Sequence, residues 1–245
     1  MKSIILFLGV IILIIATQVV FGQQPEGVIT YEIRINVHRT LPADREGMKA
    51  MVPEFRIFKQ QLFFNPAESL YKPLIEEEDD AEMDGGGGRM RMRFRQRSEV
   101  YCNQSSGKIT SMQDFMGQNF LIDDSVKVDP WKLGTDTKTV QGYECKQAYY
   151  TNEERKQTIT AWYTDQLRPF LGPDRFNTLP GAVMAVDINN GERVLVATKI
   201  ELRPLKKNEL KEPTNGQKTT QAEFRKMMDE RMKSMRNGGN VIIRN

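Results

Sequence analysis

The fold of this chain is decided by the sequence AVMAVDI-NNG-E-RVLVATKIEL, which spans residues 182–202. Two apolar runs rich in β-branched side chains flank Asn189-Asn190-Gly191, and an Asn-Gly pair between such runs is the strongest short signal for a β-hairpin. The turn needs backbone with positive φ, which asparagine and glycine adopt easily. The stretch therefore predicts two antiparallel strands joined by a tight turn.

The same organisation continues on both sides of this stretch. Short polar turns separate half-apolar segments, and residues 29–37 alternate between apolar and polar side chains, with His38 continuing the polar face. We expect strands over residues 29–37, 55–64, 99–104, 108–113, 119–122, 138–150, 156–164, 182–188 and 193–202. Since no helical pattern lies between them, they predict a mainly β (α+β) fold, with an antiparallel, hairpin-rich sheet that is curved or a half-barrel.

The first 22 residues have the pattern of a secretory signal peptide. Lys2 precedes a short apolar run, and Val20 and Gly22 provide small side chains before a polar segment. The alternative is a retained anchor helix, but the apolar run is short for spanning a bilayer. We predict an exported protein, in the periplasm or associated with the outer membrane, without a transmembrane segment in the mature chain.

The two cysteines, Cys102 and Cys145, both lie in the mature part of the chain. In an oxidising compartment an even number of cysteines makes a disulfide plausible, so this pair is a candidate disulfide. The alternative is two buried free thiols that lie too far apart to form a bond. The spacing alone leaves both open.

The formal net charge of +3 hides a partition of charge along the chain. From Arg203 onward there are eleven basic and five acidic residues, whereas residues 23–202 carry an excess of four acidic ones.

Seven acids in residues 76–84 precede four glycines, and together they predict a mobile loop over 75–88. Five arginines then alternate with other side chains over residues 89–97, which predicts a strand.

The C-terminal segment, residues 206–245, changes character. Helix-forming residues dominate over 220–236, with a threonine cap before them and two glycines after them, so we predict an amphipathic helix there. It is a candidate partner-docking helix, whose apolar side chains at helical spacing are Phe224, Met227, Met228, Met232 and Met235. The preceding residues, 23–205, are expected to form the β domain.

Motifs for common enzyme chemistry are absent from the sequence. It has no G-x-S-x-G, no P-loop and no G-x-G-x-x-G, and its single histidine cannot pair with another in a metal site. Methionine clusters can hold Cu(I), but adaptable apolar packing is the preferred interpretation. We therefore name no catalytic residue, no metal, no cofactor and no nucleic-acid partner.

Residues 120–202 resemble the GLPGLI family of secreted or periplasmic proteins from diderm bacteria. The residues that carry this resemblance are Trp131, Gly142, Tyr143, Cys145, Trp162, Tyr163, Gly172, Pro173, Phe176, Leu179, Pro180 and Gly181. The first glycine of the family's hexapeptide is replaced by Thr178, and its last two residues by Ala182-Val183. The resemblance implies an association with TonB-dependent transport through the outer membrane, and the hairpin pattern is similar to the half-barrel of LolA-type carriers.

We interpret these motif residues as corner and core of the sheet, while an alternative places Trp162, Phe176 and Leu179 at the mouth of a concave apolar face. The predicted function is a non-enzymatic cell-envelope binding or accessory protein, which holds an apolar ligand or a segment of an outer-membrane or envelope partner. Two other functions stay open. One is a hydrolase that uses carboxylates such as Asp123, Asp124 and Asp187, and the other is a purely structural envelope protein.

Overall fold

The computed structural model describes residues 25–41, 43–74 and 98–236. The predicted signal peptide, the acidic and glycine-rich loop and the arginine-rich strand lie outside these residues. Among the helices that are described, none is long and apolar enough to cross a membrane.

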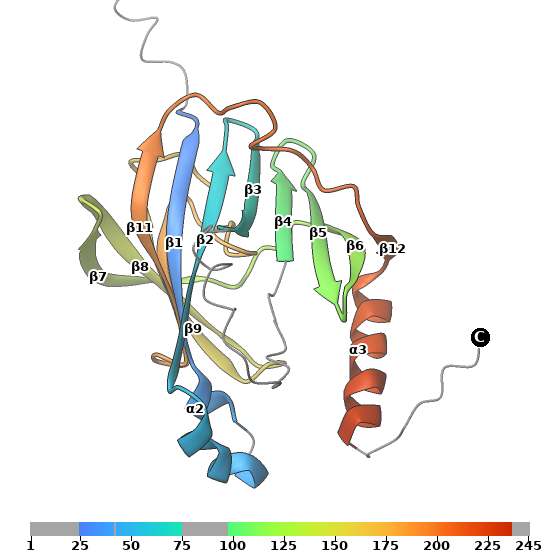
Figure 1. The fold of residues 1–245 in the computed structure, drawn as a ribbon. Coiled ribbons are helices and arrows are strands. Elements are labelled where there is room, and N and C mark those ends of the chain that lie inside the picture. The colour runs from blue at the N-terminus through green and yellow to red at the C-terminus, as the bar shows by residue number, and fades with distance from the viewer. Residues whose placement is uncertain (1–24, 42, 75–97, 237–245) are drawn as a thin grey trace, which may run out of the picture.

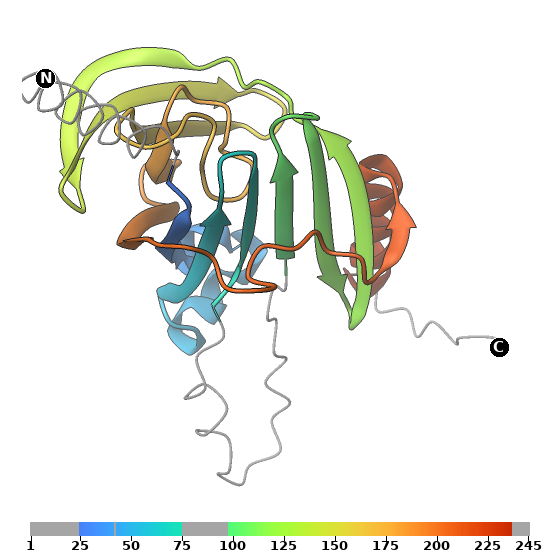
Figure 2. The same ribbon diagram turned by 90° about the horizontal axis from the view of Figure 1, so that it is seen from above.

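Twelve strands form one open sheet that curves strongly around its concave side (Figures 1 and 2). In spatial order they run β12-β6-β5-β4-β3-β2-β1-β11-β10-β9-β8-β7. The strands are β1 (Gly27–Asn36), β2 (Phe55–Phe64), β3 (Glu68–Pro73), β4 (Ser98–Asn103), β5 (Lys108–Phe115), β6 (Gln118–Ser125), β7 (Lys132–Val140), β8 (Tyr143–Asn152), β9 (Gln157–Thr164), β10 (Ala182–Ile188), β11 (Arg193–Leu202) and β12 (Gln217–Thr219). All neighbours are antiparallel except β12, which runs parallel to β6.

The predicted fold class is confirmed: the chain is mainly β, its sheet is open and curved, and a C-terminal helix follows. The predicted ranges of β2, β10 and β11 coincide with the observed ones. Asn189, Asn190 and Gly191 have φ values of 54°, 50° and 91°, as the hairpin prediction required.

Three local predictions were wrong. The expected strand over 138–150 is divided by a turn at Gln141-Gly142, where both residues have positive φ, so it forms β7 and β8. Strand β3 was missed, because its short polar sequence has no alternating pattern. His38 lies in the short helix α2 (Val37–Thr40), which Asn36 caps through its side chain, and not on a strand face.

The helices are few and lie at two ends of the sheet. After α2, a 3₁₀ helix η1 (Ala43–Met51) completes the connection between β1 and β2. The long helix α3 (Gln221–Arg236) stands beside β6, as Figure 1 shows. Its observed range agrees closely with the predicted helix over 220–236.

The core lies on the concave side of the sheet, centred on β1. Ile29, Tyr31 and Ile33 are completely buried there. The Tyr31 hydroxyl donates a hydrogen bond to the carbonyl oxygen of Val183 at 2.7 Å, and its ring meets that of Tyr71 edge-on. A buried tyrosine hydroxyl without such an acceptor would be costly, so this contact fixes how β10 approaches β1.

The connection between β9 and β10, residues 165–181, fills much of the concave side (Figure 2). Leu171 and Leu179 are buried, and the Val183 N–H donates to the Leu171 carbonyl oxygen at 2.7 Å. Arg168 reaches the opposite arm of the sheet and donates to the backbone oxygen of Glu68 at 3.0 Å. This connection therefore joins both arms of the curved sheet.

Of the two alternatives that the sequence left open for Cys102 and Cys145, the structure shows the second: both are free, buried thiols. Their strands, β4 and β8, are separated in the sheet by β3, β2, β1, β11, β10 and β9. Each sulfur has its own hydrogen bond, from Gln104 to Cys102 at 3.6 Å and from Cys145 to the Tyr143 carbonyl oxygen at 3.4 Å. Burial raises the pKa of both thiols, so both stay protonated and unreactive.

The residues after β11 stay in contact with the sheet. The Arg203 guanidinium donates two hydrogen bonds to the Glu209 carboxylate, at 2.8 Å each. The Lys72 ammonium donates to the Glu209 backbone oxygen at 3.0 Å. Farther along, Glu212 accepts from Lys108 at 2.6 Å. These contacts lead the chain back to β6, where β12 pairs and α3 begins.

Helix α3 is held by its apolar face. Phe224 is buried between the rings of Phe115 and Phe120, at centroid distances of 6.2 and 5.4 Å, while Met227 and Met228 pack beside it. Met232 is 60% exposed. Part of the predicted docking face is thus used inside the molecule. Met235 lies in the helix, but its side chain is not among those described.

Some glycines lie so close to neighbouring backbone that replacing them with alanine should destabilise the fold, whereas others have open space around them. A Cβ on Gly172 would collide with the carbonyl oxygen of Phe176, whereas a Cβ on Gly47 would meet nothing within 4 Å. We expect Gly172→Ala to lower the free energy of unfolding by about 1–3 kcal/mol, because the connection inside the sheet must shift. Urea unfolding measures this. Gly47→Ala is the control, and equal effects of the two substitutions would contradict the prediction.

The Arg203–Glu209 clamp predicts a pH dependence. Hydrogen bonds from Arg203 lower the pKa of Glu209 to about 2 from its ordinary 4.5. Because the folded pKa is the lower one, the clamp stabilises the protein fully above pH 4.5 and loses its effect as the pH falls toward 2. In Arg203→Gln, an NMR titration should show the Glu209 pKa returning toward 4.5. An unchanged value would show that the clamp does not form.

Candidate functional site

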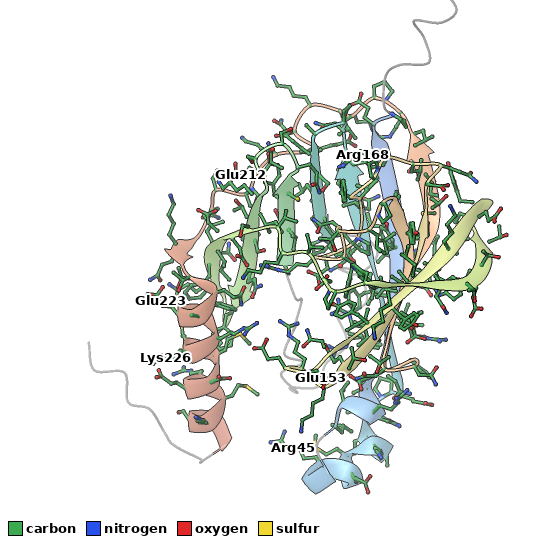
Figure 3. All side chains as sticks on the ribbon, turned by 180° about the vertical axis from the view of Figure 1, so that it is seen from behind. Arg45, Glu153, Arg168, Glu212, Glu223 and Lys226 are labelled. Carbon is green, nitrogen blue, oxygen red and sulfur yellow. The ribbon has the colours of Figure 1, made fainter. Side chains whose placement is uncertain are left out.

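A cleft of about 720 Å³ opens on the concave side of the sheet. Its walls are the end of β6, the turn between β8 and β9, the start of α3 and residues 174–177 of the β9–β10 connection. Figure 3 looks at this side, with α3 on one side and the β8–β9 turn, which carries Glu153, across from it. Isoleucines from β1, β5, β9 and β10 form its apolar floor.

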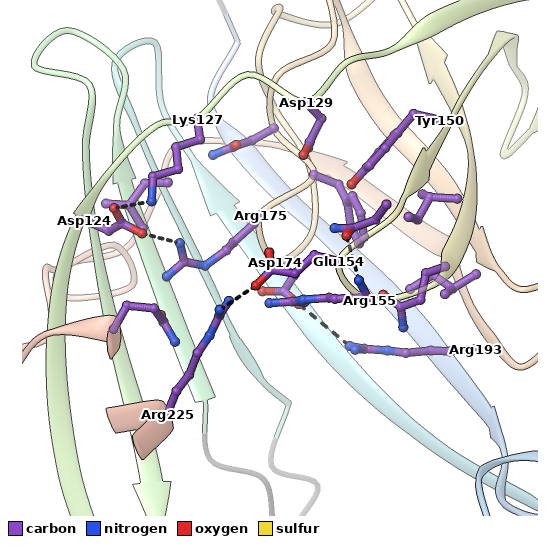
Figure 4. A pocket seen from close by; sticks show the side chains of 18 of the residues that line it. Asp124, Lys127, Asp129, Tyr150, Glu154, Arg155, Asp174, Arg175, Arg193 and Arg225 are labelled. Atoms are coloured by element: carbon purple, nitrogen blue, oxygen red, sulfur yellow. Dashed lines mark hydrogen bonds and ion pairs between the residues drawn. The ribbon is translucent and has the colours of Figure 1, made fainter. Parts of the chain in front are cut away.

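The rim and walls of the cleft are charged, with five acidic and five basic side chains (Figure 4). They are Asp124, Asp129, Glu154, Asp174 and Glu192, with Lys127, Arg155, Arg175, Arg193 and Arg225. Most of the residues that line the cleft are polar or charged, while its isoleucines and Phe176 supply apolar surface.

Asp124 and Arg175 form the best-ordered pair. Arg175 donates to the Asp124 carboxylate at 2.9 Å and to the Ser111 hydroxyl at 3.1 Å, and Lys127 lies 3.4 Å from the same carboxylate. Burial raises the pKa of Asp124, but hydrogen bonds from the Ser125 N–H and from Arg175 outweigh burial, so the net pKa is lowered. Asp124 is therefore ionised and orients Arg175 across β5 and β6.

Asp129 and Tyr150 form a second pair with different electrostatics. The Tyr150 hydroxyl hydrogen-bonds to the Asp129 carboxyl group, and burial raises the pKa of both groups. Trp131 packs edge-on against Tyr150 at a centroid distance of 4.6 Å, and its indole N–H donates to the Thr178 hydroxyl at 2.9 Å. The pair is thus held by the β9–β10 connection.

Asp174 and Arg193 form a third pair in the cleft. Their charged groups are 3.9 Å apart, which is longer than a hydrogen bond. Burial, followed by the negative charge of Asp174, raises the pKa of the neighbouring Tyr71. The Arg193 Nε and the Asn177 Oδ1 are buried and have no hydrogen-bond partner among the described residues. Unpaired buried polar atoms are uncommon in native proteins and mark this part of the cleft as incomplete.

At the mouth, an ion pair bridges the two sides. Arg225 of α3 lies 3.1 Å from the Glu154 carboxylate on the β8–β9 turn. The two side chains are 48% and 75% exposed, so the pair adds little stability. It places a movable contact across the entrance.

The motif residues of the sequence resemblance mostly serve the architecture. Gly142 forms the β7–β8 turn, Tyr163 and Leu179 are buried, and the Lys138 ammonium lies 4.4 Å from the centre of the Trp162 ring. Gly172 and Gly181 allow backbone to pass close to neighbouring backbone. Of the three residues suggested for an apolar mouth, only Phe176 lines the cleft.

The carboxylates named for a hydrolase do not come together. Asp124 lies in the cleft, but Asp123 accepts a hydrogen bond from Thr110 at 2.9 Å and Asp187 accepts one from the Gly191 N–H at 2.6 Å. Within the described ranges, no group of three histidine, cysteine or acidic residues is placed to hold a metal ion.

Sequence reasoning missed the arginines of the cleft. Arg155, Arg175, Arg193 and Arg225 come from a turn, a loop, a strand and a helix, so no spacing in the chain connects them. The one available signal was Asp174-Arg175, directly after the Gly172-Pro173 turn, since charged residues in a loop between core motifs often carry function.

Comparison with known proteins identifies a family for this chain. The family described as "N-glycanase peptide, N-terminal domain" matches residues 95–227, more than half of the chain. The chain belongs to this family. The matched residues run from β4 into α3 and include most of the cleft.

Solved structures agree with the N-glycanase N-terminal domain assignment at the level of fold. Two structures of PNGF-II, in space groups P21 and C2, superpose with TM-scores of 0.57 and 0.56 at 16% sequence identity. They cover 84% of this chain, which in turn spans about a third of theirs (34% and 33%). A DUF1329 family protein from Desulfovibrio piger superposes with a TM-score of only 0.18, at 6% identity over 77% of this chain and 89% of that one. No curated protein matches in sequence.

The Asp124–Arg175 pair predicts a local pKa change. In Arg175→Gln, the Asp124 carboxylate loses its strongest side-chain partner, so its pKa should rise and the free energy of unfolding at neutral pH should fall by about 1 kcal/mol. The loss should shrink as the pH falls below the ordinary 3.8 of an aspartate, because the lowered pKa stabilises only the ionised form. NMR titration of Asp124 and urea unfolding at two pH values check both parts. A pH-independent loss would contradict this assignment.

Proposed function

We propose that this chain is a non-enzymatic binding or accessory module of the cell envelope, and that the charged cleft is its ligand site. The observation that carries the proposal is the cleft itself: about 720 Å³, lined by ten charged side chains, with unpaired buried polar atoms at its inner end. A concave site on rigid strands with convergent polar groups is the usual form of a small-ligand site.

The chemistry of the lining favours a polar, hydroxylated ligand such as a carbohydrate. Sugar hydroxyls donate and accept hydrogen bonds at once, so they fit a surface where carboxylates and guanidinium groups alternate. Phe176 and Tyr150 add aromatic surface for the apolar faces of a sugar ring. Membership of the N-glycanase N-terminal domain family supports the same ligand class, because relatives with this domain are named for acting on glycans.

The location in the envelope, the GLPGLI resemblance and the association with TonB-dependent transport remain predictions from the sequence. They are compatible with a glycan-binding role, since an exported protein meets polysaccharides and glycoproteins. The apolar ligand or partner segment expected from the sequence also stays a prediction, and the charged side chains of the cleft favour a polar ligand instead.

One observation favours an enzymatic alternative. Asp129 has a raised pKa and lies beside Tyr150 in the cleft, an arrangement that suits a general acid. If the chain hydrolyses its ligand, Asp129→Asn should abolish turnover and leave binding intact. Binding without turnover in the unchanged protein supports the accessory role.

The test of the proposed function is binding of the full mature chain to a panel of immobilised oligosaccharides and glycopeptides, followed by calorimetry with the best ligand. We expect Arg175→Gln to weaken binding at least tenfold, because Arg175 is fixed by Asp124 and Ser111 at the cleft wall. Arg56→Gln removes an exposed arginine on β2, outside the cleft lining, and should change nothing. Equal affinities of the two variants would refute the cleft as the ligand site.

A further inference from the structure

The four arginines of the cleft differ in how many hydrogen-bond and ion-pair partners their guanidinium groups have within the protein. Arg175 has two hydrogen bonds and Arg225 has one carboxylate partner. Arg155 makes no side-chain hydrogen bond or ion pair with any described residue and acts on Asp129 only through its charge. Arg193 has one carboxylate at 3.9 Å and a buried Nε without a partner. Two arginines in one cleft therefore keep unused N–H donors.

The labelled side chains show where these donors point. In Figure 4, Arg155, Arg193 and Arg225 come from different elements and extend toward the part of the cleft where Asp174 and Glu154 lie, whereas Arg175 extends to Asp124 at the wall. Guanidinium groups bind oxyanions through paired N–H donors, and they do so more strongly where water is partly excluded.

The start of α3 adds to the positive potential. Gln221 and Ala222, the first two residues of this 16-residue helix, line the cleft. Backbone N–H groups of the first helical turn lack partners within the helix, and the helix dipole favours an anion there. The acidic residue of this turn, Glu223, is not part of the cleft lining, and its carboxylate accepts hydrogen bonds from Thr219 and Thr220.

One of the four arginines, Arg225, already has a carboxylate partner within the protein, which is Glu154. Glu154 sits on the exposed β8–β9 turn, and its carboxylate approaches Arg225 at the mouth. An exposed ion pair of this kind is worth less than about 1 kcal/mol, so a better-placed anion can displace it.

We infer that the cleft contains an oxyanion subsite, and that its ligand carries a carboxylate, sulfate or phosphate group. Arg155, Arg193 and the start of α3 receive this group, while Glu154 competes with it for Arg225. The inference rests on the proposed function and narrows its ligand to an acidic one. The five acidic side chains of the lining disfavour a polyanion, so a single charged group on an otherwise neutral ligand fits best.

The experiment measures anion binding to the full mature chain by NMR shift titration, with sulfate and phosphate at constant ionic strength against chloride. We expect saturable shifts at Arg155 and at Gln221–Ala222. Arg155→Gln and Arg193→Gln should each weaken sulfate binding at least fivefold. Glu154→Gln should strengthen it at least twofold, because the internal competitor is removed.

A matched control lies next to Glu154. Glu153 is on the same turn and equally exposed to solvent, but it does not line the cleft, so Glu153→Gln changes the net charge identically. Equal effects of Glu153→Gln and Glu154→Gln would mean that only long-range charge matters, and would overturn the subsite. NMR shifts that never saturate would mean an adventitious ion only, and they would overturn the subsite as well.

Binding of glucose, glucuronic acid and glucose 6-phosphate is compared next. The comparison shows whether the subsite prefers a carboxylate or a phosphate, and it tests the subsite independently of the proposed function. Tighter binding of one acidic sugar than of glucose supports the subsite and identifies carboxylate or phosphate as its group. If neutral oligosaccharides bind and are lost in Arg175→Gln, but sulfate and Arg155→Gln have no effect, the proposed function holds and the oxyanion subsite is refuted. If no sugar binds while sulfate saturates, the subsite holds and the carbohydrate proposal fails.

Discussion

The structure depends on how an open, strongly curved sheet buries its concave side. In the part of the chain that the structure describes, twelve strands form one layer and no second sheet covers its apolar inner face, whose exposure would drive association. Residues 165–181 cover this face, because they cross the concave side and form hydrogen bonds with both arms of the sheet. Gly172 and Gly181 make the crossing possible, since any side chain there would collide with backbone.

The same connection that fills the core also builds the cleft. Leu171 and Leu179 are buried under it, whereas Asp174 and Arg175 lie between them in sequence and face the space that it leaves open. Arg175 is tied to β5 and β6, and Asp174 to β11, so the two charges are positioned by strands that do not move independently. The charged residues of this connection are therefore positioned by contacts with strands, even though they come from a loop.

Most of the strands could be predicted from the sequence, although β3 and β12 were missed, whereas the cleft could not. Strand ranges followed from alternation and from turns such as Asn189-Asn190-Gly191, which are local properties. The Gln141-Gly142 turn was overlooked because both flanking segments alternate in register and read as one strand. The charged cleft joins residues as far apart in sequence as Asp124 and Arg225, and only the curvature of the sheet brings them together. The pairing of the two cysteines stayed open at the level of sequence for the same reason, because the order of strands in the sheet, and not the spacing of the cysteines, separates β4 from β8.

Every wall of the cleft comes from this curved sheet, its loops and α3. The fold is shared with the PNGF-II structures, where the aligned part is 84% of this chain and 34% of theirs. The C-terminal residues complete this fold: Glu209 and Glu212 guide the chain along the sheet, β12 adds to β6, and α3 closes one side of the cleft with Arg225. The charge pattern of the cleft is therefore set within this fold, by side chains that come from β6, the β8–β9 turn, the β9–β10 connection, β11 and α3.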